Sequence, residues 1–305
     1  FIAVQDNFLT PSARYADLVL PACTQFEVWG VTDGWKYGEE VILMPKIVEP
    51  PFETKSDYRI CAELAERFSV YDKFTEGGRD EKAWTQWMID EYYRKTRFPD
   101  MPVFRILSES NEAVYSKKVV TPLVAFEEFR KDPEANPLRT PSGKIEIFSP
   151  RLHDMKNARE IPAIPKYIQE WESPFGPEAK KYPLQAMGHH YMPRVHSTHD
   201  NNPWTMESFP QVVFINPADA AERGLKSGDL VKVWNDRGTI VLPCRLTRKI
   251  MPGVVDIPQG AWYKPDSNGI DRGGCVNTLA SEKWTPLAKG NPQHTIMVQA
   301  EKFNG

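Results

Sequence analysis

The sequence has no large excess of charge and no long apolar run. Its 305 residues carry 38 Lys plus Arg against 41 Asp plus Glu, a formal net charge of −3. This balance supplies no basic surface for nucleic acid or for an acidic membrane. The apolar stretches are only a few residues long, whereas a membrane-spanning helix needs ~20 such residues, so a transmembrane segment is excluded.

Cysteine is rare, and the common catalytic motifs are missing. The four cysteines, Cys23, Cys61, Cys244 and Cys275, lie too far apart for a C-x-x-C pair. Each has apolar neighbours, so buried free thiols are predicted. No phosphate-binding glycine loop, zinc-protease helix or serine-hydrolase elbow occurs. These absences give no support to a self-contained enzyme of those classes.

Proline is abundant, with 27 residues against 18 glycines. This ratio favours short elements joined by rigid turns, and the length favours two domains. The chain begins with an apolar run and no initiator Met, so we expect a piece of a longer protein.

Strands and helices alternate in the first part of the sequence. Residues 1–4 and 16–20 are apolar runs typical of strands. Ser56 is a good N-cap, with Asp57 in the first turn of a helix that carries Ile60, Leu64 and Phe68 on one stripe. Further helices are predicted over 80–95 and 123–130. This pattern indicates an α/β domain.

The second part of the sequence is rich in short strands. Ile145 and Ile147 alternate with polar residues, as in a half-buried strand, and residues 150–182 read as a surface connection. Asn216-Pro217 predicts the start of a helix that Gly224 ends, and residues 235–238 predict a hairpin turn. Strands are predicted at 184–187, 212–215, 230–234, 240–242, 254–257 and 295–298. Such a series suggests a barrel or a sandwich.

Three groups of residues could bind a ligand. The segment GHHYMPRVHSTHDNN follows a predicted strand, and its polar side chains suit either a ligand-binding loop or a solvated surface loop. Residues 274–278 and 286–294 combine Gly, Pro and amide side chains, as is usual where backbone approaches a polar ligand. Asp6 and Asp57 could each accept hydrogen bonds from a guanine edge, although an aspartate in such a position, taken singly, is more often a cap or turn residue.

Long stretches of the chain resemble the C-terminal part of the molybdopterin oxidoreductases of the DMSO reductase family. They are QDNFLTPSARYADLVLPACTQFE, TPSGKIEIFS, NPADAAERGLKSGDLVKVWNDRG and GGCVNTLASEKWTPLAKGNPQH. The resemblance implies part of an α/β cofactor-binding domain (residues 1–150), a connection (151–181) and a double-psi β-barrel (182–305). Trp262 is then expected in the barrel core.

The resemblance also implies the site. The cofactor would be molybdenum bis(molybdopterin guanine dinucleotide), with guanosine near Gln5 and Asp6 and a guanine edge at Asp57. No residue of the chain is expected to bind the metal. Some relatives carry a lysine near Val28 that this chain lacks, so one charge contact is in doubt. The remaining implied cofactor residues are Gly188, His189, Arg194, His196, Ser197, Asn277, Gln293 and His294.

The activity implied is that of a terminal reductase for S- or N-oxides in anaerobic respiration. The molybdenum ligand and a 4Fe–4S cluster are expected upstream of Phe1. An Fe–S electron-transfer subunit, a membrane anchor subunit and a position on the periplasmic side of the membrane are also implied. Two alternatives stay open. One is a module that binds a nucleotide or a protein without catalysis, and the other is a selenate, nitrate or formate enzyme on the same scaffold.

Overall fold

The computed structural model describes residues 1–35, 38–110, 113–117 and 122–304. The chain divides into two compact units, Phe1–Glu127 and Glu128–Gly305, which are treated separately below. The predicted domain limits at 150 and 181 stay predictions. No helix in the described ranges is both long and apolar enough to cross a bilayer.

The first unit begins with two parallel strands, β1 (Ala3–Asp6) and β2 (Leu18–Pro21). A parallel bridge between Ala22 and Lys55 adds the segment that leads into helix α1 (Asp57–Arg67). Three successive segments therefore end at one edge of this small sheet. The first strand was predicted at 1–4, with a polar break after it, but Gln5 and Asp6 belong to the strand itself because they pair with Leu20 and Pro21.

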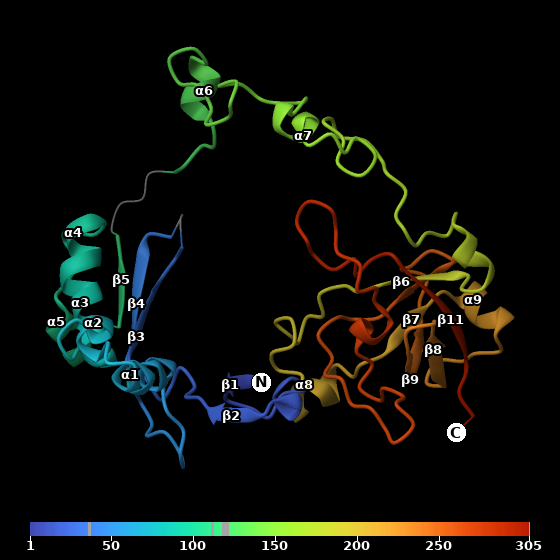
Figure 1. Cartoon of the computed structure of the whole chain (residues 1–305), viewed down its shortest axis with the longest axis horizontal. Coiled ribbons are helices and arrows are strands. Elements are labelled where there is room, and N and C mark those ends of the chain that lie inside the picture. The colour runs from blue at the N-terminus through green and yellow to red at the C-terminus, as the bar shows by residue number, and fades with distance from the viewer. Residues whose placement is uncertain (36–37, 111–112, 118–121, 305) are drawn as a thin grey trace. The chain divides into compact units, whose positions relative to one another are not determined.

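A second sheet in this unit carries its main core. Strands β3 (Gly30–Asp33), β4 (Glu40–Met44) and β5 (Val114–Ser116) are antiparallel, and helices α3 (Glu81–Trp87) and α4 (Arg94–Thr96) lie alongside them (Figure 1). A π-helical segment, η2 (Met88–Tyr93), joins these helices, so the helix predicted over 80–95 is confirmed with one irregular stretch. The core is formed by Val41, Leu43, Ile89, Tyr93, Phe98, Met101, Phe104 and Leu107.

The remaining helices of the two units are short. They are α2 (Tyr71–Thr75), α5 (Phe104–Glu109), α6 (Glu127–Lys131), α7 (Pro150–Asp154), α8 (Pro203–Ser208) and α9 (Pro217–Glu222). The 3₁₀ turns are η1 (Ala13–Tyr15), η3 (Pro177–Lys180) and η4 (Val276–Leu279). The helix predicted at 123–130 is therefore only α6.

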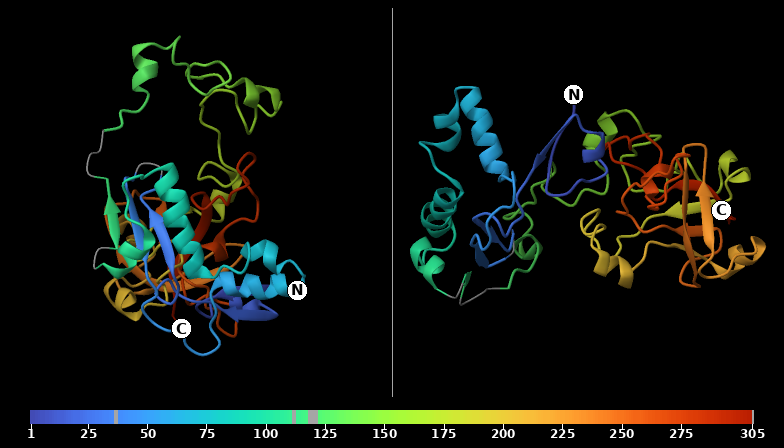
Figure 2. Two further views of the ribbon diagram at one scale, coloured as in Figure 1. Left: turned by 90° about the vertical axis from the view of Figure 1, so that its left-hand side faces the viewer. Right: turned by 90° about the horizontal axis from the view of Figure 1, so that it is seen from below.

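Between α6 and strand β6 (Leu184–Met187) the chain is largely irregular (Figure 2). The strand predicted at 145–147 is wrong, because both isoleucines are exposed and no described strand pairs with them. An alternating pattern becomes a strand only when another strand satisfies its backbone groups. The segment 150–182, predicted as a connection, contains little regular structure, and Glu172 joins it to the barrel by pairing with Arg237 and accepting from Met297 N at 3.0 Å.

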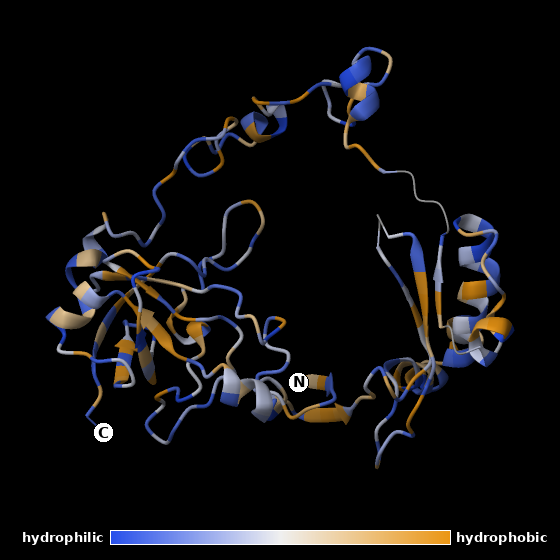
Figure 3. Ribbon diagram, turned by 180° about the vertical axis from the view of Figure 1, so that it is seen from behind, coloured by the Kyte–Doolittle hydropathy of each residue, from blue (hydrophilic) through white to orange (hydrophobic). Residues whose placement is uncertain are grey.

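The second unit contains a closed six-stranded barrel in the order β10-β6-β11-β8-β9-β7. Its interior is apolar (Figure 3) and includes Leu184, Val213, Val233, Ile240 and Val298. The predicted fold class, an α/β part followed by a six-stranded barrel, is confirmed. The strands are β6 (Leu184–Met187), β7 (Val213–Ile215), β8 (Leu230–Trp234), β9 (Thr239–Leu246), β10 (Val254–Asp256) and β11 (Ile296–Lys302).

Two local predictions in the barrel are confirmed by hydrogen bonds. Asn216 Oδ1 accepts from Ala218 N at 2.9 Å at the start of α9, and Gly224 follows the helix with φ of +62°. Asn235 N donates to Gly238 O at 3.1 Å in the turn between β8 and β9. Residues close in sequence are therefore sufficient to form both features.

Candidate cofactor-binding site

Gln5 and Asp57 meet at the carboxyl edge of the small parallel sheet. Gln5 Nε2 donates a hydrogen bond to Asp57 Oδ1, although 52 positions separate them in the chain. Asp57 is exposed in the first turn of α1, and the preceding Ser56 caps the helix by accepting from Arg59 N at 3.0 Å. Ligands of parallel α/β sheets bind outside the carboxyl ends of the strands, so this edge is a candidate site.

Asp6 behaves differently from its neighbour. Its Oδ1 lies 3.4 Å from Phe8 N and accepts a long hydrogen bond within its own turn, and its carbonyl oxygen accepts from Ala22 N. Side chains of successive strand residues point to opposite faces. Of the two strand-end residues, Gln5 is therefore the one that shares a face with Asp57.

The barrel gathers a second group of the predicted residues at one end. Gly188 and His189 follow β6, and β10 is its parallel neighbour, so both strands end at the same rim. A Cβ on Gly188 would lie 3.8 Å from Val276 Cγ1, which puts the turn carrying Asn277 next to this rim. His189 Nδ1 lies 2.7 Å from Asp256 Oδ2 at the end of β10.

The late segment reaches the same rim. Gln185 on β6 donates from Nε2 to His294 O at 2.8 Å, and β11 starts immediately afterwards, with Ile296 opposite Ala186. Asn277 and His294 are exposed and Gln293 is half-buried. Their side chains are thus accessible beside Gly188.

The polar loop after β6 presents some side chains outward and buries others. His196 and Ser197 are exposed. Arg194 is buried, and its Nη1 lies 3.0 Å from Asp200 Oδ1. Burial lowers the pKa of the Arg194 guanidinium, although Asp200 opposes this shift. The loop is therefore held by an internal ion pair, and a cofactor contact by Arg194 itself stays a prediction.

A buried carboxylate that the sequence reading missed orders the neighbouring loop. Asp271 has no exposed surface and accepts from the backbone N–H groups of Lys264, Gly273 and Cys275, at 2.7 to 2.8 Å. An aspartate beside glycines usually indicates only a turn, so the sequence held no signal for this role.

Trp262 and the cysteines also differ from expectation. Trp262 is half-buried, outside the barrel core, and donates from Nε1 to Ser197 O at 2.8 Å.

All four cysteines are free, but only Cys244 is buried and Cys61 is exposed. Sequence neighbours on a helix point in different directions, so apolar neighbours did not bury Cys61. Burial raises the pKa of the Cys275 thiol.

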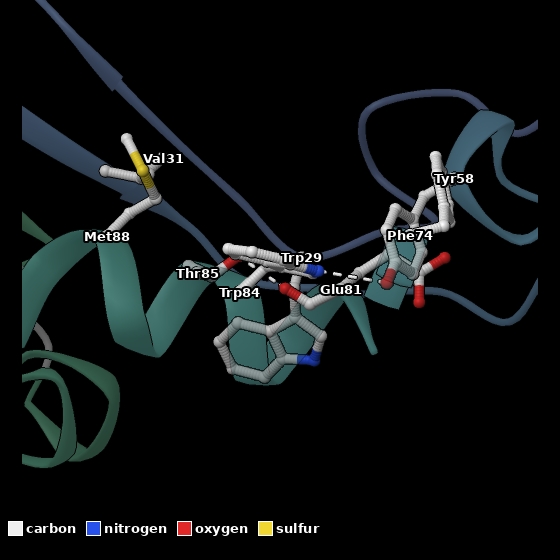
Figure 4. A pocket seen from close by; sticks show the side chains of 8 residues that line it. All are labelled: Trp29, Val31, Tyr58, Phe74, Glu81, Trp84, Thr85 and Met88. Carbon is white, nitrogen blue, oxygen red and sulfur yellow. Dashed lines mark hydrogen bonds between the residues drawn. The ribbon is translucent and has the colours of Figure 1, made fainter. Parts of the chain in front are cut away.

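The first unit also has an apolar pocket of about 450 Å³. Figure 4 shows Val31 and Met88 at one end and Tyr58 and Phe74 at the other. The remaining lining residues are Trp29, Glu81, Trp84 and Thr85. This mainly aromatic lining does not offer the amide and cationic groups that phosphates require, so the pocket is not assigned to a dinucleotide.

Comparison with known proteins identifies the family. The model of a molybdopterin dinucleotide binding domain matches residues 184–297, and the model of a molybdopterin oxidoreductase matches residues 1–67. The chain belongs to the molybdopterin oxidoreductases of the DMSO reductase family. It corresponds to a C-terminal portion of such proteins.

Individual relatives support this assignment. Dimethyl sulfoxide reductase DmsA of Escherichia coli (strain K12) is 41% identical over 99% of this chain and 38% of the relative. The dimethyl sulfoxide/trimethylamine N-oxide reductase of Cereibacter sphaeroides is 36% identical over 99% of this chain and 38% of that protein. The chain thus spans little more than a third of the length of these family members.

A solved structure shares the fold. Acetylene hydratase from Pelobacter acetylenicus superposes with a TM-score of 0.73 at 23% identity, over 99% of this chain and 40% of the hydratase. The polar residues of both units suit the large cofactor of the family by their chemistry. Carboxylate and amide groups lie at one sheet edge, and imidazole, hydroxyl and amide groups lie at the barrel rim. Among the described residues, no group of three or more His, Cys, Asp or Glu side chains could hold a metal ion.

Proposed function

We propose that the chain is the C-terminal cofactor-binding part of a molybdenum bis(molybdopterin guanine dinucleotide) terminal reductase. Its substrate would be dimethyl sulfoxide or a related S- or N-oxide, reduced in anaerobic respiration. The observation that carries the proposal is 41% identity to a dimethyl sulfoxide reductase along 99% of the chain. The polar groups at the sheet edge and at the barrel rim support it, because a large dinucleotide needs many polar contacts.

Asp57 is the proposed reader of a guanine. Its carboxylate is exposed, Gln5 fixes Oδ1 from one side, and Oδ2 has no hydrogen-bond partner in the described part of the chain. A carboxylate can accept from both N1–H and N2–H₂ of guanine. Gln5 would then orient the carboxylate, and Asp6 would contribute to the guanosine side of this edge.

The barrel rim is proposed to contact the pterins and the pyrophosphate. Gly188 allows backbone to approach the ligand, and His189, His196 and Ser197 offer donors to phosphate oxygens. The bound molybdenum group would supply the oxygen-atom and electron transfer. These residues would bind and orient the group. Asn277, Gln293 and His294 complete the proposed set of contacts, and Arg194 would contribute by holding the loop through its ion pair with Asp200.

The proposal extends to partners that the longer relatives suggest. Electrons would come from an Fe–S subunit and pass through a 4Fe–4S cluster held elsewhere in the whole protein. A membrane anchor subunit would keep the enzyme at the periplasmic face. The similarity to dimethyl sulfoxide reductase DmsA supports these proposals.

The test is Asp57→Ala in the full-length protein. Losing a charged acceptor costs about 1.5–3 kcal/mol, which corresponds to roughly 10- to 100-fold weaker retention of the dinucleotide. Guanine nucleotide released on denaturation and molybdenum are measured per protein, with about two nucleotides per metal expected in the wild type. Asp72→Ala is the matched control, because Asp72 is also an exposed first-turn aspartate of the same unit.

Two results would contradict the proposal. Unchanged nucleotide and molybdenum content in Asp57→Ala would remove the guanine assignment. A wild-type protein that contains neither molybdenum nor guanine nucleotide would favour a binding module without catalysis. Turnover of dimethyl sulfoxide, trimethylamine N-oxide, selenate and nitrate by the loaded protein then distinguishes the substrate classes.

A further inference from the structure

The exposed turn at Val195–Thr198 is held in an unfavourable backbone conformation. Val195 and Thr198 exchange backbone hydrogen bonds of 3.3 and 3.0 Å, and His196 between them has φ of +55°. For a residue with a Cβ, this left-handed region costs roughly 1–2 kcal/mol. An exposed turn keeps such a conformation only when its surroundings impose it.

The segment after β10 imposes this conformation on the tip of the turn. Gly260 has φ of +92°, and a Cβ at this position would lie only 1.7 Å from His196 O. Trp262 donates from Nε1 to Ser197 O at 2.8 Å. Backbone and indole thus contact successive residues of the tip, and only glycine fits at position 260.

A buried ion pair closes the base of the same turn. The side chains of Arg194 and Asp200 are 1% and 2% exposed, and they approach to 3.0 Å. Asp200 Oδ2 also accepts from Trp262 N at 2.8 Å. Gln211 accepts from Arg194 Nη2 and donates to Pro258 O at 2.8 Å. Base and tip are therefore fastened to one segment, residues 258–262.

We propose that Asp200, Gln211, Gly260 and Trp262 are positioning residues that preorganise this turn for the dinucleotide. Arg194 belongs to the same set and does not itself contact the cofactor. The turn then presents the His196 and Ser197 side chains, and their backbone N–H groups, which have no acceptor among the described residues. A preformed turn avoids the entropy cost of ordering a loop on binding. This inference rests on the proposed function.

The first experiment removes, one at a time, the contacts that Trp262 and Gly260 make with the turn in the full-length protein. Trp262→Phe deletes only the indole donor, and Gly260→Ala displaces the tip. Amide hydrogen exchange at Val195 and Thr198, whose N–H groups carry the hydrogen bonds of the turn, is expected to accelerate about tenfold, the equivalent of 1.4 kcal/mol. Guanine nucleotide is expected to dissociate several-fold faster, while exchange in the barrel strands is unchanged. Trp234→Phe on β8 is the matched control and changes neither quantity.

The second experiment separates positioning from direct contact. Arg194→Gln, Asp200→Asn and the double variant are compared for the rate of nucleotide release. Two residues of one ion pair give non-additive losses, so the double variant is expected to lose no more nucleotide retention than either single variant. Additive losses would give Arg194 a cofactor contact of its own and overturn its assignment.

The remaining outcomes distinguish the inference from the function on which it rests. Wild-type nucleotide retention in both Trp262→Phe and Gly260→Ala overturns the positioning role alone. Unchanged amide exchange at the turn in both variants would show that Gly260 and Trp262 do not hold its conformation. A wild-type protein without guanine nucleotide overturns the proposed function and the positioning role with it.

Discussion

Replacement of Asp271 by asparagine tests the buried carboxylate beneath the Gly273–Thr278 loop. One carboxylate oxygen accepts from Lys264 N and Gly273 N, both at 2.8 Å. The other accepts from Cys275 N at 2.7 Å and from Thr278 Oγ1 at 3.4 Å. Asp271→Asn keeps the size of the side chain but turns one acceptor into a donor.

The least costly orientation places the new NH₂ group toward Cys275 and Thr278. The Thr278 hydroxyl can rotate and accept from it, whereas the partly buried Cys275 N–H loses its acceptor. One buried unsatisfied amide costs about 1–3 kcal/mol, and two hydrogen bonds weaken from charged to neutral. We therefore expect a loss of about 2–4 kcal/mol in the free energy of unfolding of the barrel unit.

This loss is measured by denaturant unfolding of the full-length protein, with hydrogen exchange in the barrel strands as the readout. At roughly 2–4 °C per kcal/mol for a unit of this size, the melting temperature should fall by about 4–16 °C. Asp154→Asn, at an exposed aspartate of the same unit, should change the stability by less than about 0.5 kcal/mol. A loss below about 1 kcal/mol for Asp271→Asn would refute the reasoning, because it would mean that Cys275 N–H finds another acceptor.

Two further predictions concern the helix cap of α9 and the thiols. Asn216→Ala removes the hydrogen bonds to Ala218 N and Ile250 O and should cost about 1–2 kcal/mol of unfolding free energy. Denaturant unfolding measures this cost, and a stability equal to that of the wild type would contradict the prediction. At pH 8 iodoacetamide should label Cys61 well before Cys275, because Cys61 is exposed while burial raises the pKa of Cys275 and keeps it in the unreactive thiol form. Raising the pH to 10 should increase the Cys275 rate, as followed by mass spectrometry, and equal rates at pH 8 would count against the buried environment.

The barrel strands were predictable because their signal is local. Short apolar runs between turn signals marked the strands that became β6 to β11, and Asn216 and Asn235 marked a helix start and a hairpin by their own hydrogen bonds. The strand expected at 145–147 shows the limit of this reasoning. Its alternation is typical of a half-buried strand, but strand formation also requires a pairing partner.

The candidate site divides in the same way. The sequence motifs predicted Gln5 and Asp57 separately, and the fold alone joined them by a hydrogen bond between residues 52 positions apart. The roles of Asp271 and Gln211 had no signal in the sequence. Each is recognised only by the backbone groups that converge on it from distant segments.

What the sequence determined alone is the family, the succession of an α/β part and a barrel, and the chemical types of the candidate ligand groups. Those properties depend on residue identity, spacing and short-range hydrogen bonds. Only the tertiary structure decided which of these groups remain accessible to a ligand and which are buried and paired with other protein groups. Arg194 and His196 lie two positions apart in one polar loop, yet Arg194 is buried against Asp200 and His196 is exposed. The reason is that burial and pairing depend on segments brought together by folding, here Gln211 and residues 258–262, which are remote in the chain.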